Sequence, residues 1–65
     1  MNEPEKLKHL LEHWKEHNEA HVKTYNEWAL KAVSLGEEEL SNILKQIAEE
    51  SKKLDGLFIK ALKSI

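Results

Sequence analysis

Four histidines form the most distinctive chemical pattern in this sequence, since His9, His13, His17 and His21 recur at intervals of four residues. Residues four apart are neighbours on one face of an α-helix, so consecutive imidazoles lie close together. Imidazole nitrogen is a ligand for zinc, nickel and copper. Each step of four residues turns about 40° around a helix of 3.6 residues per turn. The series therefore winds around the helix, and only adjacent members can share one ion.

A complete metal site needs ligands beyond two adjacent histidines. Acidic side chains between the histidines, such as Glu12, and a second chain are the available sources. The predicted metal-binding residues are His9, His13, His17, His21 and Glu16. Nickel and zinc are the expected ions. The competing interpretation treats the outer three histidines as solvated surface residues and His21 as a hydrogen-bonded core residue.

Residues 13–17, HWKEH, also match the H-x-x-E-H signature of inverted zinc proteases. In such an enzyme both histidines hold zinc, and the glutamate is the general base for a bound water. A third ligand and a substrate cleft are also required, and a chain of 65 residues has little room for a cleft. The sequence contains no Glu-x-x-His pair of the di-iron type and no glycine-rich phosphate loop. We therefore expect that the protein is not an enzyme.

Two helices would position these histidines, because apolar residues recur at helical spacing along the chain. The first predicted helix spans about residues 3–34, and Pro4 lies in its first turn, where a missing N–H is harmless. Gly36 is the predicted stop. Acidic residues follow it, as favoured at the positive end of a helix dipole, and begin the second predicted helix at about 37–64.

A short connection between two long helices makes them antiparallel neighbours, so the predicted fold class is an all-α two-helix hairpin. Residues 1–65 form one predicted domain. Asp55-Gly56 is a common turn signal inside the second helix. A separate third helix from Leu57 is therefore the alternative to a continuous second helix.

The predicted contact between the helices follows one apolar stripe on each, spaced by three and four residues. Its members are Leu7, Leu11, Trp14, Asn18, His21, Tyr25, Trp28 and Ala32 on the first helix. Those on the second are Leu40, Leu44, Ile47, Ser51, Leu54, Phe58, Ala61 and Ile65. In this register His21 meets Ser51, with Asn18 beside them. This buried polar layer is expected to fix the register or the oligomeric state.

Further apolar residues lie outside this stripe, including Leu10, Val22, Ile43 and Leu57. A single pair of helices cannot cover so much apolar surface. We therefore expect a homodimer in which two hairpins form a four-helix bundle. The assembly either binds a transition metal through its histidines or is a purely structural, protein-interaction module with no metal role.

Composition narrows the class of protein further. The 65 residues include ten lysines, twelve acidic residues and no cysteine, and the formal net charge is −2. The lack of cysteine excludes disulfides and thiolate metal sites. The near-neutral charge and the lack of arginine argue against nucleic-acid binding. No apolar run is long enough to span a membrane and no signal-peptide pattern is present, so we expect a cytoplasmic protein.

Residues 9–21, HLLEHWKEHNEAH, followed by YNEWA at 25–29, resemble a family of small archaeal and bacterial helical domains of unknown function. These domains share an H-L-L-x-H-W-x-x-H-N-x-x-H pattern and a second amphipathic helix. Similar segments occur as separate chains and fused behind small nickel-binding proteins of the CooT type. The resemblance implies a role near metal, nickel in particular, and a metal-handling protein as a partner.

Overall fold

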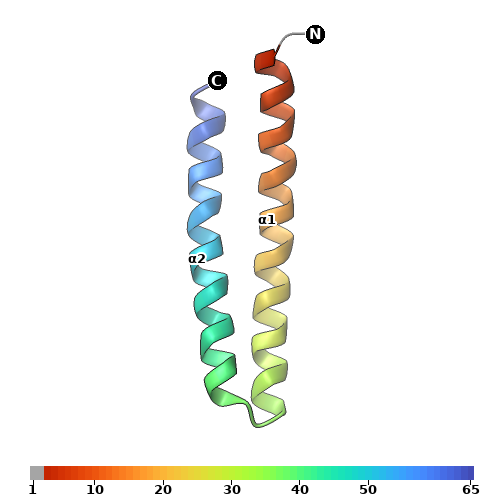
Figure 1. The fold of residues 1–65 in the computed structure, drawn as a ribbon, viewed down its shortest axis with the longest axis vertical. Helices are drawn as coiled ribbons and strands as arrows, with labels where there is room; N and C mark the ends of the chain where they lie inside the picture. Colours follow the sequence, from red (N-terminus) through yellow and green to blue (C-terminus); the bar gives the residue numbers. More distant parts are fainter. Residues whose placement is uncertain (1–2) are drawn as a thin grey trace.

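A computed structural model describes residues 3–65 as two long antiparallel helices joined by a tight turn (Figure 1). Helix α1 spans Glu3–Ser34 and helix α2 spans Glu38–Lys63. The predicted all-α hairpin is confirmed, and no strand occurs in the described part of the chain. Helix α2 is continuous through Asp55-Gly56, so the alternative of a third helix is wrong. Neither described helix is long and apolar enough to cross a membrane.

The turn between the helices depends on Gly36, whose φ of +79° lies in the left-handed region. The N–H of Gly36 donates to the carbonyl of Val33 at 3.0 Å, and that of Glu37 donates to the carbonyl of Ala32 at 2.8 Å. These two bonds are those of a Schellman motif, which satisfies the last carbonyls of a helix. No atom lies within 4 Å of a Cβ added at Gly36. The backbone conformation, not crowding, therefore requires glycine here.

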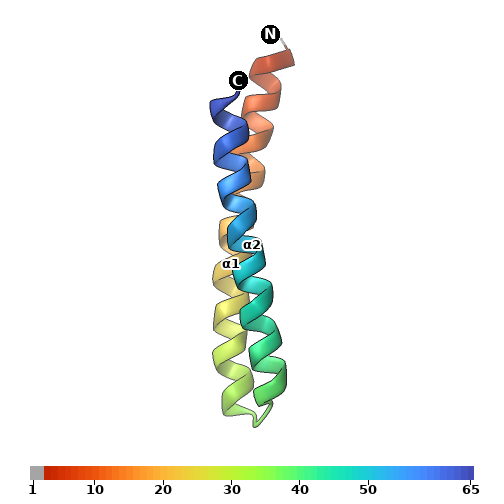
Figure 2. The same cartoon turned by 90° about the vertical axis from the view of Figure 1, so that its left-hand side faces the viewer.

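The hairpin is a single layer, with Cα extents of 52 × 16 × 10 Å. Seen edge-on in Figure 2, the helices overlap along their length and cross one another. Among the described residues, those that are fully buried are small: Ala29, Ala32, Ser41 and Ala48. The Ser41 hydroxyl donates a hydrogen bond of 2.7 Å to the carbonyl of Ala29. Small side chains thus let the two backbones approach closely in the half of the hairpin near the turn.

The contact between the helices follows a different stripe from the predicted one. Its members on α1 are Leu11, Lys15, Asn18, Val22, Tyr25, Ala29 and Ala32. Those on α2 are Ser41, Leu44, Ala48, Ser51, Asp55, Phe58, Ala61 and Leu62. The predicted position of His21 between the helices is wrong, because this side chain is exposed. The physical reason is that small residues give the closest helix packing, which leaves the larger apolar residues to one side.

Candidate functional site

The four histidines form a row of exposed side chains on α1. The ring centroids of His13 and His17 are 4.5 Å apart, and those of His17 and His21 are 6.1 Å apart. The His21 ring stacks on Tyr25, with a centroid distance of 6.0 Å. The structure therefore brings His17 close to both His13 and His21, as their spacing predicts, whereas His9 is exposed at the start of the row.

These pairs have the separation that a shared metal ion requires. With zinc at about 2.0 Å from each ring nitrogen, two imidazoles of a tetrahedral site have centroids about 5 Å apart. The spacings of 4.5 and 6.1 Å lie on either side of this value. Among residues 3–65, however, no group of three or more His, Cys, Asp or Glu is arranged to hold one ion. The described part of one chain therefore offers pairs of histidine ligands only. Glu16 does not complete a group of three with either pair.

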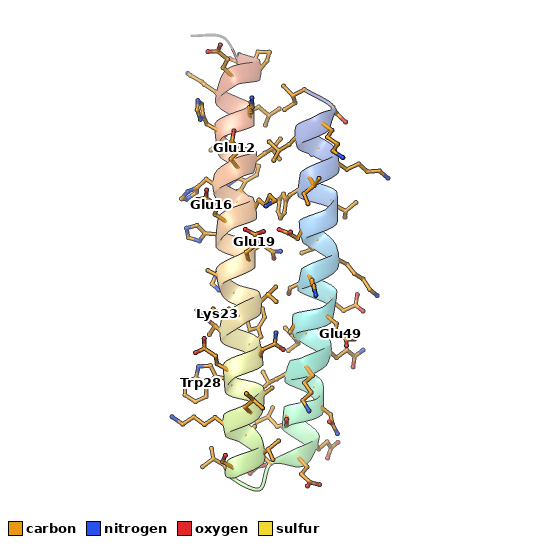
Figure 3. All side chains as sticks on the ribbon, turned by 180° about the vertical axis from the view of Figure 1, so that it is seen from behind. Glu12, Glu16, Glu19, Lys23, Trp28 and Glu49 are labelled. Carbon is orange, nitrogen blue, oxygen red and sulfur yellow. The ribbon has the colours of Figure 1, made fainter. Side chains whose placement is uncertain are left out.

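One face of the hairpin is charged. Figure 3 looks onto this face and labels Glu12, Glu16, Glu19 and Lys23 of α1 and Glu49 of α2. Lys15 reaches this face from the contact between the helices and donates a hydrogen bond of 2.9 Å to Glu19. This face also carries the exposed apolar side chains Leu30, Val33 and Ile59, which lie among its charged residues.

A polar layer crosses the contact between the helices. Asn18 Nδ2 donates a hydrogen bond of 2.7 Å to the carbonyl of Ser51. The hydrogen bond to Glu19, together with the nearby Asp55 carboxylate, raises the pKa of Lys15 above its usual 10.5. Asp55 Oδ1 is buried and has no hydrogen-bond partner among the described residues. The layer thus contains the predicted asparagine and serine, but an unpredicted lysine and aspartate in place of histidine.

The opposite face is apolar and exposed. It carries a series spaced by seven residues: Leu7, Trp14, His21 and Trp28 on α1, and Leu35 in the turn after α1. On α2 the corresponding series is Leu40, Ile47, Leu54 and Ala61. Most of these residues directly precede members of the contact stripe: Trp14, His21 and Trp28 do so on α1, as do all four residues of the α2 series, of which Ala61 is itself a member of the stripe. Because equivalent positions on two antiparallel helices fall on the same side of their common plane, the two series form one surface, which we call the apolar face.

The apolar face leaves large side chains in contact with solvent. Trp14 is 45% exposed, Trp28 is 53% exposed and Leu54 is 47% exposed. The whole hairpin exposes 5274 Å². A compact monomer of the same mass, 7.6 kDa, exposes about 4,300 Å². The hairpin therefore exposes about 1,000 Å² more total surface than a compact monomer of its mass, because it is a single elongated layer.

The predicted interface and core residues divide into two groups. Half-buried between the helices are Leu11, Asn18, Tyr25, Leu44, Ser51 and Phe58. Exposed on the apolar face are Leu7, Trp14, Trp28, Ile47 and Leu54. The second group stays a prediction for an interface with another molecule. The sequence analysis missed the small residues Ala29, Ser41 and Ala48; the available signals were the spacing of seven between Ser41 and Ala48 and that of three between Ala29 and Ala32.

Fold and surface together define a small helical hairpin with one unpaired apolar face and a row of histidines at its edge. The chain belongs to the family described as Domain of unknown function (DUF8180), which matches residues 7–65. An uncharacterized protein of Archaeoglobus fulgidus is 38% identical over 58 residues, which cover 89% of this chain and 92% of that protein. No solved structure matches the chain. The expectation of a small helical domain of unknown function is therefore confirmed.

Proposed function

We propose that this hairpin is a non-enzymatic assembly module that pairs its apolar face with a second copy to form a four-helix bundle. The observation that supports this proposal is the exposed surface of Trp14, Trp28, Ile47 and Leu54 on one face of a single layer. A specific protein interface buries about 800 Å² on each partner. The excess surface of the hairpin, about 1,000 Å², is of this size.

The expected energy of association is favourable. Burial of about 800 Å² on each chain, roughly two-thirds of it apolar, removes about 1,000 Å² of apolar surface from water. At 25 cal/mol per Å² this contributes about 25 kcal/mol. The loss of translational and rotational freedom opposes it by about 4–15 kcal/mol, and the ordering of interface side chains and the desolvation of polar groups oppose it further. A dimer should therefore persist at micromolar concentrations of the chain.

Size-exclusion chromatography with light scattering tests this proposal. The wild-type chain should elute with twice the mass of the 7.6 kDa monomer. Leu54→Glu, on the apolar face, should be monomeric at the same concentration. Leu30→Glu is the matched control, because Leu30 is 69% exposed on α1 and lies outside the apolar face. A wild-type chain that stays monomeric at micromolar concentration contradicts the proposal.

Binding of a divalent transition metal by the histidine row is the second function that we propose. The observation in its favour is the close approach of adjacent rings, 4.5 Å for His13 and His17 and 6.1 Å for His17 and His21. The resemblance to domains fused behind CooT-type proteins makes nickel the first ion to test, and a metal-handling protein the first partner.

Titration with Ni²⁺, Zn²⁺ and Cu²⁺ tests the metal proposal. His17 belongs to both ring pairs, so His17→Ala should abolish tight binding and leave the helices intact. Nickel and copper should quench Trp14, which follows His13 directly, whereas zinc should compete without strong quenching. Imidazole binds metal only when neutral, so the affinity for metal should fall as the solution is made more acidic. Binding weaker than about 10 µM, equal for all three ions and unchanged in His17→Ala, would leave only the assembly function.

A further inference from the structure

The apolar face has a carboxylate at its border, that of Glu50 on α2. Ile43, Glu50 and Leu57 each follow a member of the α2 series by three residues, so they lie beside that series on the side away from α1. Ile43, Ile47 and Glu50 line one shallow hollow. Glu50 pairs with Lys53 at 3.2 Å, but both side chains are exposed, and such a pair contributes little stability. If the apolar face is covered, this carboxylate needs a partner in the interface.

Two histidines of α1 lie at the height of this carboxylate. His21 belongs to the series of the apolar face, and His17 follows Trp14 by three residues, so it borders the face as Glu50 does on α2. Both rings are exposed, and their centroids are 6.1 Å apart. The hydrogen bonds between the helices join residues whose numbers add to about 70. Glu50 is therefore level with residues 19 and 20 of α1, midway between the two histidines.

A two-fold axis parallel to the helices would bring the three residues together. This axis packs the apolar faces of two hairpins with α1 against the partner's α2, and it leaves every residue at its own height. The register within the hairpin therefore also sets the register between the chains. The tryptophans are level with pairs of apolar residues: Trp14 with the partner's Leu54 and Leu57, and Trp28 with the partner's Leu40 and Ile43. His17 and His21 lie on either side of the partner's Glu50.

The alternative two-fold axis is perpendicular to the helices and packs α1 against the partner's α1. Two hairpins overlap fully only if this axis passes near their mid-length, which is the height of Glu50. Glu50 would then lie close to the partner's Glu50, and His21 close to the partner's His21. Like charges placed opposite each other in an interface weaken it. Charge complementarity therefore favours the parallel axis, which pairs imidazoles with a carboxylate.

The geometry points to a metal site between the chains, in which His17, His21 and the partner's Glu50 bind a divalent ion such as Zn²⁺. This inference rests on the proposed homodimer. Two histidines four residues apart on a helix can hold one zinc ion, and two histidines with a glutamate and a water form a known zinc shell. The described part of one chain offers no group of three ligands, so the partner's carboxylate completes the site. The two-fold axis generates two such sites, one on each side of the bundle.

Zinc titration by calorimetry, combined with sedimentation equilibrium, tests the ligands. Wild-type protein should bind one Zn²⁺ per chain and dimerise more tightly as it does so. Free Zn²⁺ at ten times its dissociation constant should tighten the dimer by a factor of about 11 for each site, about 120-fold in all. Glu50→Gln and His21→Ala should dimerise without zinc but lose this coupling. Glu49→Gln is the matched control, because Glu49 lies on the charged face, and it should keep the coupling (Figure 3).

A spin-label distance tests the axis without any metal. The chain has no cysteine, so Glu37→Cys in the turn provides one labelling position. The parallel axis places both turns at the same end of the bundle, and the two labels should be about 10–20 Å apart, since neighbouring helices pack at 8–10 Å. The perpendicular axis places the turns at opposite ends of a molecule 52 Å long. A distance of that length would overturn both the axis and the site.

Three further results would overturn the inference, and they differ in what they leave standing. Zinc binding that is lost in His13→Ala and unchanged in Glu50→Gln would assign the ion to the His13 and His17 pair within one chain. A dimer that binds no Zn²⁺ would remove the site and leave the assembly function. A wild-type chain that is monomeric with and without Zn²⁺ would remove the assembly function together with the site.

Discussion

Trp14 is the residue whose truncation should weaken the dimer most clearly. Its side chain is 45% exposed in the hairpin and lies on the apolar face. A tryptophan presents about 250 Å², so about 110 Å² remains to be buried, which corresponds to about 3 kcal/mol per chain. Both copies of Trp14 contribute in a symmetric dimer. Trp14→Ala should therefore cost about 5 kcal/mol of association energy, which raises the dimer dissociation constant by a factor of about 4,000.

Sedimentation equilibrium over a range of chain concentrations measures this constant directly. The helical content of Trp14→Ala should remain that of the wild type once it associates, because Trp14 lies outside the contact between α1 and α2. Leu30→Ala is the matched control: its side chain is 69% exposed on the same helix, and its dimer constant should change less than about twofold. Equal dimer constants for the two variants would refute the assignment of the interface to the apolar face.

Three further predictions concern the hairpin itself. Gly36→Ala should lower the free energy of unfolding in urea by about 1–2 kcal/mol, because the φ of +79° strains any residue with a Cβ. Gly56→Ala should raise it by about 1 kcal/mol, because Gly56 lies inside α2 with open space around the added Cβ. Lys15→Met should destabilise the hairpin, because it leaves the Asp55 carboxylate without its nearby cation. The double variant with Lys15→Met and Asp55→Leu should regain at least wild-type stability, which a double-mutant cycle would measure. Because the pKa of Lys15 is raised, its stabilising contribution is present below about pH 10.5 and lost at higher pH, so the wild-type urea midpoint should fall there more than that of Lys15→Met.

The sequence predicts the helices and the turn but only half of the contact between them. Helical spacing, Pro4 and Gly36 identify two helices and their stop, because these signals act within a few residues of the chain. The contact stripe was assigned to the largest apolar residues, such as Trp14 and Trp28. The structure instead packs the hairpin through alanines and a serine. Two apolar stripes lie side by side on each helix, and hydrophobicity alone does not tell which one faces the other helix.

The candidate metal site was predictable only as a set of neighbours. A spacing of four residues ensures that His17 approaches both His13 and His21, whatever packs against the helix. The register of the hairpin, by contrast, depends on residues far apart in the sequence. That register places Lys15 level with Asp55, and it is set by hydrogen bonds such as that from Asn18 to Ser51. The register predicted from the sequence, in which His21 meets Ser51, differs from the observed one by about two residues. Periodicity alone therefore does not fix the register.

The close packing near the turn also determines the order in which the hairpin forms. The hydrogen bond between Ser41 and Ala29 spans 12 residues, whereas that between Asn18 and Ser51 spans 33. A short loop loses less entropy on closing, so the end at the turn closes first and the contact then extends toward the chain termini. Opening follows the reverse order, and amide hydrogens should exchange fastest near Leu7 and Leu62 and slowest near Ala29 and Ala48. The histidine row lies in the later-closing half, so the part of α1 that carries it gains the support of α2 only after the turn has formed.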